Sequence, residues 1–145
     1  MSKLYLPDSN VLIHALRKNS AAHPSCRQWL LDCVQSGAEI GLSELVETSL
    51  LRIATHPKVG ALDVGQVLSF WAEDLWAYPG TLRLAAGKPH RAILKKLVSD
   101  LSLSGNDLND AWLAALAIEH GAILISTDEG FKRFPGLIWQ NPVRV

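Results

Sequence analysis

The chain has 145 residues, of which 48% are hydrophobic and 19% are charged. This composition argues against a disordered chain and predicts one globular domain, residues 1–145, large enough to bury a core. Fourteen basic and fourteen acidic residues give a formal net charge of zero, which argues against a uniformly basic nucleic-acid-binding protein. No apolar run is long enough to span a bilayer and the N-terminus has no signal-peptide pattern, so we expect a cytoplasmic protein with no membrane contact.

The hydrophobic pattern alternates between short apolar runs, typical of buried strands, and longer segments with apolar residues at helical spacing. Gly37 and Gly121 follow predicted helices, and Asp63 with Gln66 forms a capping-box pattern. This order of elements predicts an α/β fold with a mostly parallel central sheet. In chain order, we expect a strand at residues 4–6, helices at 10–17 and 24–35, a strand at 38–42, helices at about 44–56 and 64–75, a strand at 81–84, helices at about 89–98 and 107–120, and strands at 122–125 and 137–140.

Carboxylates follow three of the predicted strands. Asp8, Glu44 and Asp128 each come within two residues or so of a strand end, and Asp110 lies in the first turns of a predicted helix. In an open parallel sheet, the carboxyl ends of the strands share one edge, where ligands bind. Four carboxylates there would repel one another unless a cation lay among them. Because oxygen ligands favour Mg²⁺ or Mn²⁺ over zinc, the sequence predicts a site for one of these ions.

Each of these carboxylates also has an ordinary structural interpretation. Asp8 is suited to cap the helix that follows it, and Asp128 is suited to form an Asx turn. Glu44 and Asp110 lie in first turns of helices, where a negative charge complements the helix dipole. Glu47, one turn after Glu44, competes with it for the same place in the site.

The charges are segregated along the chain although their sum is zero. Residues 75–99 contain no acidic residue, whereas residues 100–129 contain six acidic residues and no Lys or Arg. A basic segment beside an acidic metal site could bind the phosphates of RNA, or its lysines could only solvate a helix face. Both interpretations stay open for the basic residues of this segment, which are Arg83, Lys88, Arg91, Lys95 and Lys96.

Several motifs in a fixed order give the chain a resemblance to a known family. D-S-N at residues 8–10, S-E-L at 43–45, L-N-D-A-W-L-A-A-L-A at 108–117 and S-T-D at 126–128 resemble the PIN-domain family. More narrowly, they look like the VapC-type toxin ribonucleases of bacterial toxin–antitoxin pairs. Segments 50–57 and 131–137 are also similar to that family. The resemblance covers nearly the whole chain, and its specificity comes from the ordered set.

The resemblance implies a PIN-like three-layer α/β/α sandwich with a metal site. The carboxylates implied to be catalytic and to hold Mg²⁺ or Mn²⁺, directly or through water, are Asp8, Glu44, Asp110 and Asp128. Two polar residues, Asn10 and Ser126, match the family positions whose side chains orient those carboxylates. The chain departs from the family pattern after Asp128, where Gly130 stands in place of a further acid. A single metal position is therefore expected, and a second stays open.

By resemblance, we expect a metal-dependent endoribonuclease that hydrolyses phosphodiester bonds in single-stranded or loop regions of RNA. It would be the toxin of a toxin–antitoxin pair, with a small antitoxin protein bound across the site, and it would form a homodimer. Two alternatives stay open. A PIN module with little or no activity could serve as a binding partner, which Gly130 favours. A metal-dependent phosphohydrolase could act on small phosphate esters, although the chain lacks a glycine-rich phosphate loop.

Overall fold

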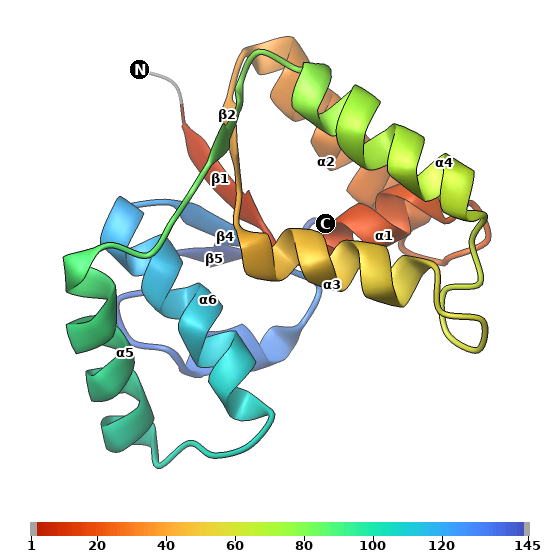
Figure 1. Cartoon of the computed structure of the whole chain (residues 1–145). Coiled ribbons are helices and arrows are strands. Elements are labelled where there is room, and N and C mark those ends of the chain that lie inside the picture. Colours follow the sequence, from red (N-terminus) through yellow and green to blue (C-terminus); the bar gives the residue numbers. More distant parts are fainter. Residues whose placement is uncertain (1–2, 144–145) are drawn as a thin grey trace.

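The computed structural model describes residues 3–143. Within this range five strands form one sheet, and every neighbouring pair is parallel (Figure 1). The order across the sheet is β3-β2-β1-β4-β5, so β1 lies at the centre. The predicted α/β fold is confirmed, and the sheet is wholly rather than mostly parallel. The strands are β1 (Leu4–Pro7), β2 (Glu39–Leu42), β3 (Thr81–Arg83), β4 (Ile123–Ile125) and β5 (Trp139–Gln140).

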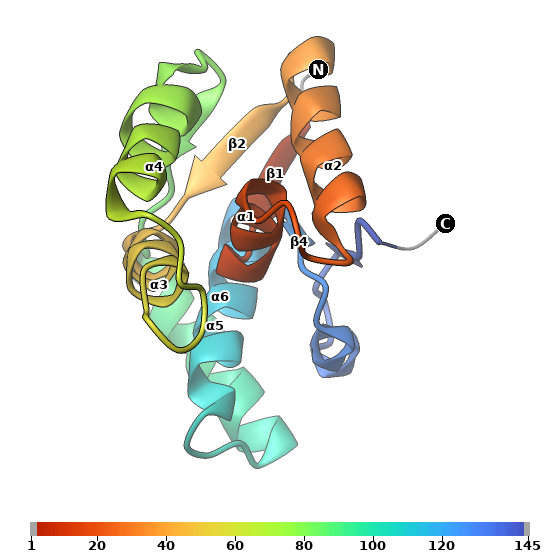
Figure 2. The same ribbon diagram turned by 90° about the vertical axis from the view of Figure 1, so that its right-hand side faces the viewer.

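Helices connect the successive strands and lie against the sheet (Figures 1 and 2). None of the helices within residues 3–143 is long and apolar enough to cross a membrane. The helices before β3 are α1 (Ser9–Leu16), α2 (His23–Ser36), α3 (Glu44–Ala54), α4 (Val64–Ser69) and the π-helical segment η1 (Phe70–Leu75). Those after β3 are α5 (Lys88–Leu101), α6 (Asp107–His120) and the 3₁₀ helix η2 (Glu129–Arg133).

The two faces of the sheet bury different side chains. Ile125 of β4 packs with Val11 and Ala15 of α1 and with Cys26 of α2. Its neighbour Leu124 belongs instead to the larger cluster, which also contains the buried alanines of α6. Because successive residues of a strand point to opposite faces, helices cover both faces of the sheet. This is the α/β/α layering that the sequence led us to expect.

Local signals set several helix ends where they were predicted. Gly37 and Gly121 follow α2 and α6 with φ angles of 72° and 63°, in the left-handed region that glycine adopts without steric cost. The carboxylate of Asp63 accepts a hydrogen bond of 3.0 Å from the backbone N–H of Gln66 at the start of α4. The predicted cap of this helix is therefore confirmed.

Two predicted elements were partly wrong. The helix expected at residues 64–75 changes at Phe70 from α-helical to π-helical hydrogen bonding. This change accompanies a long-range contact that periodicity does not contain, because the indoles of Trp71 and Trp76 both reach a buried carboxylate on α3. The last strand, expected at residues 137–140, is confined to Trp139 and Gln140, which pair with the short strand β4.

Candidate acidic active site

Asp8 lies at the carboxyl end of β1, beside the end of β4. Its backbone N–H donates to the carbonyl of Ile125 at 2.8 Å, which continues the pairing of the two strands. One carboxylate oxygen accepts from the N–H of Ser9 at 2.7 Å, so Asp8 caps α1. The other oxygen accepts from the hydroxyl of Ser126 at 2.9 Å. Asp8 is thus a helix cap whose second oxygen is directed to the end of the neighbouring strand.

Asn10 and Ser126 form a small hydrogen-bond network around this carboxylate. The Asn10 amide nitrogen lies 3.4 Å from Asp8 Oδ2 and 3.2 Å from Ser126 Oγ. Ser126 is fully buried, and its hydroxyl also accepts from the backbone N–H of Asp128 at 3.1 Å. These contacts restrict the orientation of Asp8, as expected of residues that position a carboxylate; that they do so for a metal stays a prediction.

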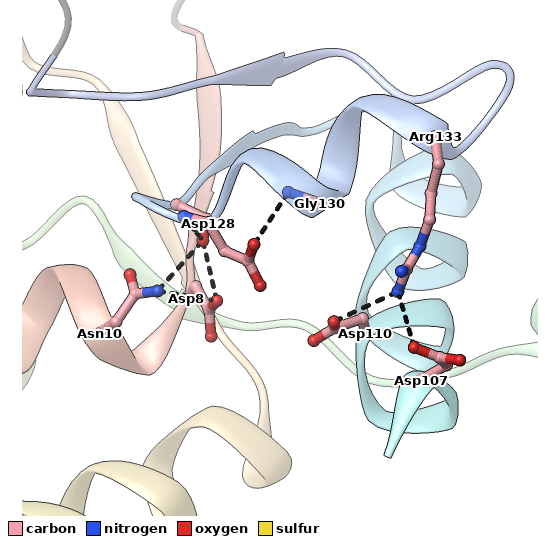
Figure 3. Close-up of polar contacts among 8 residues, drawn as sticks. Asp8, Asn10, Asp107, Asp110, Asp128, Gly130 and Arg133 are labelled. Carbon is pink, nitrogen blue, oxygen red and sulfur yellow. Dashed lines mark hydrogen bonds and ion pairs between the residues drawn. The ribbon is translucent and has the colours of Figure 1, made fainter. Parts of the chain in front are cut away.

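Asp128 follows β4 in an exposed loop. Its Oδ1 accepts from the N–H of Gly130 at 2.8 Å at the start of η2, so the Asx-turn interpretation is correct. Figure 3 shows its carboxylate lying between the side chains of Asp8 and Asp110. Gly130 packs closely against this side chain, since a Cβ at that position would lie 3.0 Å from Asp128 Oδ1.

Asp110 reaches the same place from the first turn of α6. The alanines that follow it in the helix are buried, which lets α6 pack closely against the sheet. Its Oδ2 lies 3.4 Å from Nη2 of Arg133, and the same nitrogen lies 3.4 Å from Oδ1 of Asp107 (Figure 3). Arg133 therefore places a positive charge at one side of the three carboxylates. No role was predicted for this arginine from the sequence.

We call the carboxylates of Asp8, Asp110 and Asp128 the acid cluster, and burial and neighbouring charges change the ionisation of Asp8 and Asp110. Burial raises the pKa of Asp8, and the charge of Asp128 raises it further, against the hydrogen bonds from Ser126 and Ser9. Burial also raises the pKa of Asp110, as do the charges of Asp128 and Asp8, and Arg133 opposes this rise. The acid cluster thus holds more negative charge than its surroundings neutralise, which a bound cation would relieve.

A cavity of about 170 Å³ opens beside Asp8 and Asp110 and is bounded by α6 and α3. Val46, Ser49 and Arg52 line it from α3 at intervals of three residues, the spacing of one helix face. Arg52 is exposed and makes no ion pair with any residue in the described range 3–143. Ser49 and Arg52 were not predicted as site residues, although their spacing from Val46 in the sequence could have indicated them.

Glu44 lies outside this cavity, although we expected it to meet the other three carboxylates. Its side chain is 87% exposed, and its ion-pair partner is Arg83, at 3.9 Å. It lines a neighbouring cavity instead. The reason is helix geometry: residues 45, 46 and 49 of α3 face the acid cluster, which leaves the first residue of the helix at the edge of that face. Glu44 thus does not line the cavity beside Asp8, and its part in holding a metal stays a prediction.

Glu47, the competitor of Glu44, is a structural carboxylate. It is only 6% exposed. Its Oε2 accepts from the indole N–H groups of Trp71 at 2.7 Å and Trp76 at 2.9 Å, and its Oε1 lies 2.9 Å from Nη1 of Arg83. Since both oxygens are engaged in joining η1 and β3 to α3, Glu47 does not belong to the acid cluster.

The predicted RNA-binding residues lie in two places. Arg83 ends β3, where it is bound to Glu47, and its guanidinium carbon lies 5.5 Å from the centroid of the Trp76 ring. The others lie on α5 and are exposed, with Lys96 paired to Asp100 at 3.1 Å. None of them lines the cavity beside Asp8. A role in binding RNA stays a prediction for Arg83, Lys88, Arg91, Lys95 and Lys96.

The donor chemistry of the acid cluster fits a hard divalent cation, because its ligands are carboxylate oxygens. Within the described part of the chain, however, no three Asp, Glu, His or Cys side chains stand close enough together to hold an ion as they are placed. The observed hydrogen bonds explain this, because Asp128 is turned to Gly130 and Asp110 to Arg133. Holding a metal would require the three carboxylates to come closer together.

Comparison with known sequences gives a consistent result over almost the whole chain. The family model described as "PIN domain" matches residues 5–137. Ribonuclease VapC43 of Mycobacterium tuberculosis (strain ATCC 25618 / H37Rv) is 34% identical over 137 residues, which cover 94% of this chain and 93% of that protein. Ribonuclease VapC33 of the same strain is 32% identical over 143 residues, which cover 97% of this chain and 99% of that protein.

Solved structures of low sequence identity share the fold. The chain matches one in the crystal structure of VapBC2 from Rickettsia felis, bound to a DNA fragment from its promoter, with a TM-score of 0.73 at 22% identity, covering 95% of this chain and 98% of that one. A chain of a toxin–antitoxin complex from Klebsiella pneumoniae matches with a TM-score of 0.61 at 17% identity, covering 97% of this chain and 99% of that one. These likenesses confirm the predicted fold.

Proposed function

Because the chain belongs to the PIN-domain family, we propose that it is a metal-dependent endoribonuclease that cuts single-stranded or loop regions of RNA. We propose further that it is the toxin of a toxin–antitoxin pair. Support comes from the relatives named ribonucleases, whose similarity extends over nearly the full length of both chains. The observation that carries the proposal is the acid cluster, in which Asp8, Asp110 and Asp128 arrive from β1, α6 and the loop after β4 (Figure 3).

In this proposal, Asp8, Asp110 and Asp128 hold Mg²⁺ or Mn²⁺, and the network of Asn10 and Ser126 fixes the orientation of Asp8. The chemistry that a bound divalent cation supplies is activation of a water molecule and neutralisation of negative charge on the phosphate. Burial and mutual repulsion raise the pKa of Asp8 and of Asp110. These shifts apply without a cation, and a bound cation would favour the ionised form of both carboxylates.

The two arginines beside the acid cluster have different roles in the proposal. Arg52 lines the cavity from α3, and its guanidinium can donate two parallel hydrogen bonds to a phosphate of the RNA backbone. Arg133 neutralises part of the charge of Asp110 and would release that carboxylate when a cation binds. The cavity of about 170 Å³ suits a strand whose nucleotides can be splayed apart, as in single strands and loops.

We propose a small antitoxin protein as the partner that inhibits the enzyme by covering the acid cluster, and a homodimer as the assembled toxin. The fold shared with chains of toxin–antitoxin complexes supports the first of these. The product of an adjoining reading frame is the protein to test as antitoxin. Stoichiometric inhibition of RNA cleavage by that product would support the pairing, and unchanged cleavage in a complex of the two would contradict it.

The test of the enzymatic function is incubation of the purified protein with a pool of structured RNAs in Mg²⁺, Mn²⁺ or EDTA. The matched variant is Asp8→Asn, because asparagine can still cap α1 but removes the charge. We expect discrete RNA fragments that require the metal and are absent with the variant. A small phosphate ester tested in parallel separates a ribonuclease from a general phosphohydrolase, which would hydrolyse the ester and leave the RNA intact.

A binding module without activity is the second candidate. It is favoured by Gly130 and by the spacing of the acidic side chains, which within residues 3–143 do not bring three metal-ligating groups close enough together to hold an ion. Its signature in the same experiment would be RNA that remains intact with either metal although the protein is folded and free of antitoxin. Discrete, metal-dependent cleavage would exclude it.

A further inference from the structure

We propose that the cavity next to the acid cluster binds a nucleobase of the RNA and so determines which sequence is cut, a proposal that rests on the ribonuclease function proposed above. This base cavity has a volume of about 590 Å³ and is lined by Glu44, Arg83, Leu94 and Trp112, among others. Its size is within the range of small-ligand pockets. We infer its role from its position beside the acid cluster, from the aromatic ring of Trp112 in its wall, and from the side-chain amide of Asn109, which lines both cavities.

The base cavity and the cavity of the acid cluster adjoin each other. Leu45 of α3 and Asn109 of α6 line both of them. On α6, Asp110 is directed to one cavity and Trp112 to the other. A nucleotide whose phosphate lies at the acid cluster can therefore extend its base past Leu45 and Asn109 toward Trp112.

Trp112 has the properties of a stacking platform. It is half-buried, and its ring is supported by His90 of α5, with ring centroids 4.8 Å apart. His90 is buried and its Nε2 lies 2.9 Å from the carbonyl oxygen of Trp112, which fixes the two side by side. An aromatic ring held in this way stacks on any base, and such stacking is worth about 1–3 kcal/mol per base, or roughly 5- to 150-fold in affinity.

Asn109 supplies a group that can distinguish one base from another. Its side chain is exposed and its amide makes no hydrogen bond with any residue of the range 3–143. It lies three residues before Trp112, on the same side of α6. A carboxamide offers a donor and an acceptor together, the pair that recognises the edge of an unpaired base.

A nucleobase explains the base cavity better than a second protein chain does. Within residues 3–143, the Trp112 indole N–H also has no hydrogen-bond partner, whereas those of Trp71 and Trp76 are bonded to Glu47. Two polar groups that no protein group within residues 3–143 engages lie beside an apolar wall, which fits a ligand with apolar faces and polar edges. A protein surface closing over them would need to supply matching groups or leave them buried without partners, at a cost in binding.

The test uses a single-stranded RNA oligonucleotide that the wild type cuts, and versions of it with the base removed at each position flanking the cut. With the wild type, we expect one abasic position to lower kcat/KM about ten-fold or more. With Trp112→Ala, the intact substrate should be cut more slowly and the abasic version at the same rate as the intact one. Trp112→Phe should restore most of the discrimination, and Asn109→Ala should relax the preference among the four bases at that position.

The oligomeric state of each variant, measured by light scattering, distinguishes a base cavity that binds a nucleobase from one that binds a second protein chain. The inference is overturned if Trp112→Ala and Asn109→Ala keep the wild-type profile, or if they change the oligomeric state and leave base preference unaltered. Binding of the same intact and abasic oligonucleotides in EDTA gives a readout without cleavage. If the wild type cuts no RNA, the same binding comparison uses a single-stranded oligonucleotide containing all four bases and its abasic versions, and discrimination among them would support the base cavity and contradict the ribonuclease.

Discussion

The two oxygens of Asp8 have different partners. One accepts from the N–H of Ser9 and caps α1, and the other accepts from Ser126 and Asn10 at the end of β4. From the sequence, Asp8 could be interpreted either as a helix cap or as a residue of the metal site. These two interpretations excluded each other only if the whole side chain had a single role. A carboxylate has two oxygens and several lone pairs, so an aspartate between a strand and a helix can do both.

The raised pKa of Asp110 predicts a gain in stability when its charge is removed. A carboxyl whose pKa is higher in the folded than in the unfolded protein binds its proton more tightly when folded. Its contribution to stability is therefore fully present at pH values below the ordinary pKa of 3.8. That contribution is lost as the pH rises through the raised pKa of the folded protein. In EDTA at neutral pH, we therefore expect Asp110→Asn to raise Tm by a few degrees and to flatten the fall of Tm with pH.

The control for this prediction is Asp107→Asn. Asp107 lies on the same helix and pairs with the same arginine, but it lies outside the acid cluster. Thermal unfolding followed by circular dichroism from acid to neutral pH compares the two variants. A Tm of Asp110→Asn equal to or below that of the wild type at neutral pH would show that repulsion in the acid cluster is weak.

Gly130 predicts how the metal affinity can be increased. A side chain at this position meets Asp128 Oδ1 at 3.0 Å, a close contact with the end of a flexible side chain, which can give way by a few tenths of an ångström. We expect Gly130→Asp to add a ligand and to tighten Mn²⁺ binding several-fold, as measured by calorimetry. Gly130→Asn makes the same steric demand without the charge, and an equal gain from it would mean that charge is not the cause.

Among the secondary-structure elements, the site residues at strand ends could be predicted from the sequence more readily than the site residues on helices. Asp8 and Asp128 were predictable because parallel strands carry their carboxyl ends to one edge of the sheet. Asp110 followed from the small residues that let α6 approach that edge. The face that α3 presents was not predictable from its first residue. The place of Glu44 outside the cavity of the acid cluster was therefore not foreseen, and Arg52 was missed. The π-helical segment η1 depends on contacts with Glu47 that are distant in sequence.

Glu47 joins three elements, and its removal should destabilise the protein. Its oxygens accept hydrogen bonds from Trp71 and Trp76 and contact Arg83. Glu47→Gln leaves at least one of these donors without an acceptor, so we expect a loss of about 1–3 kcal/mol in the free energy of unfolding, measured with urea. Glu44→Gln, at a site 87% exposed, should change it by less than about 0.5 kcal/mol. Similar losses from the two variants would refute the structural role.

Arg52 should act on substrate binding from its position on α3. Removing a charged hydrogen bond to phosphate costs about 1.5–3 kcal/mol, so we expect Arg52→Ala to lower kcat/KM for RNA about ten-fold or more, and Arg52→Lys to recover part of it. Lys95→Ala removes an exposed cation that does not line the cavity of the acid cluster and should have a smaller effect that salt abolishes. Equal effects of Arg52→Ala and Lys95→Ala would contradict a local role for Arg52.

At the scale of the whole molecule, a net charge of zero conceals an uneven distribution. The parallel sheet gathers negative charge at one edge, and α5 carries exposed cations elsewhere. The fold class could be predicted from sequence because alternating helices and strands favour a parallel sheet covered by helices. The ion pair of Asp110 with Arg133 and the hydrogen bond of Asp128 with Gly130 could not be predicted from the sequence, because they depend on local side-chain contacts.

We propose that Asp8, Asp110 and Asp128 together hold a divalent cation. Binding of Mn²⁺, followed by electron paramagnetic resonance, tests this without reference to activity. The wild type and Asp107→Asn are expected to bind one Mn²⁺ per chain, and Asp110→Asn is expected to lose most of that affinity. Binding by Asp110→Asn as tight as that of the wild type, or no binding by any of the three proteins, would contradict the account.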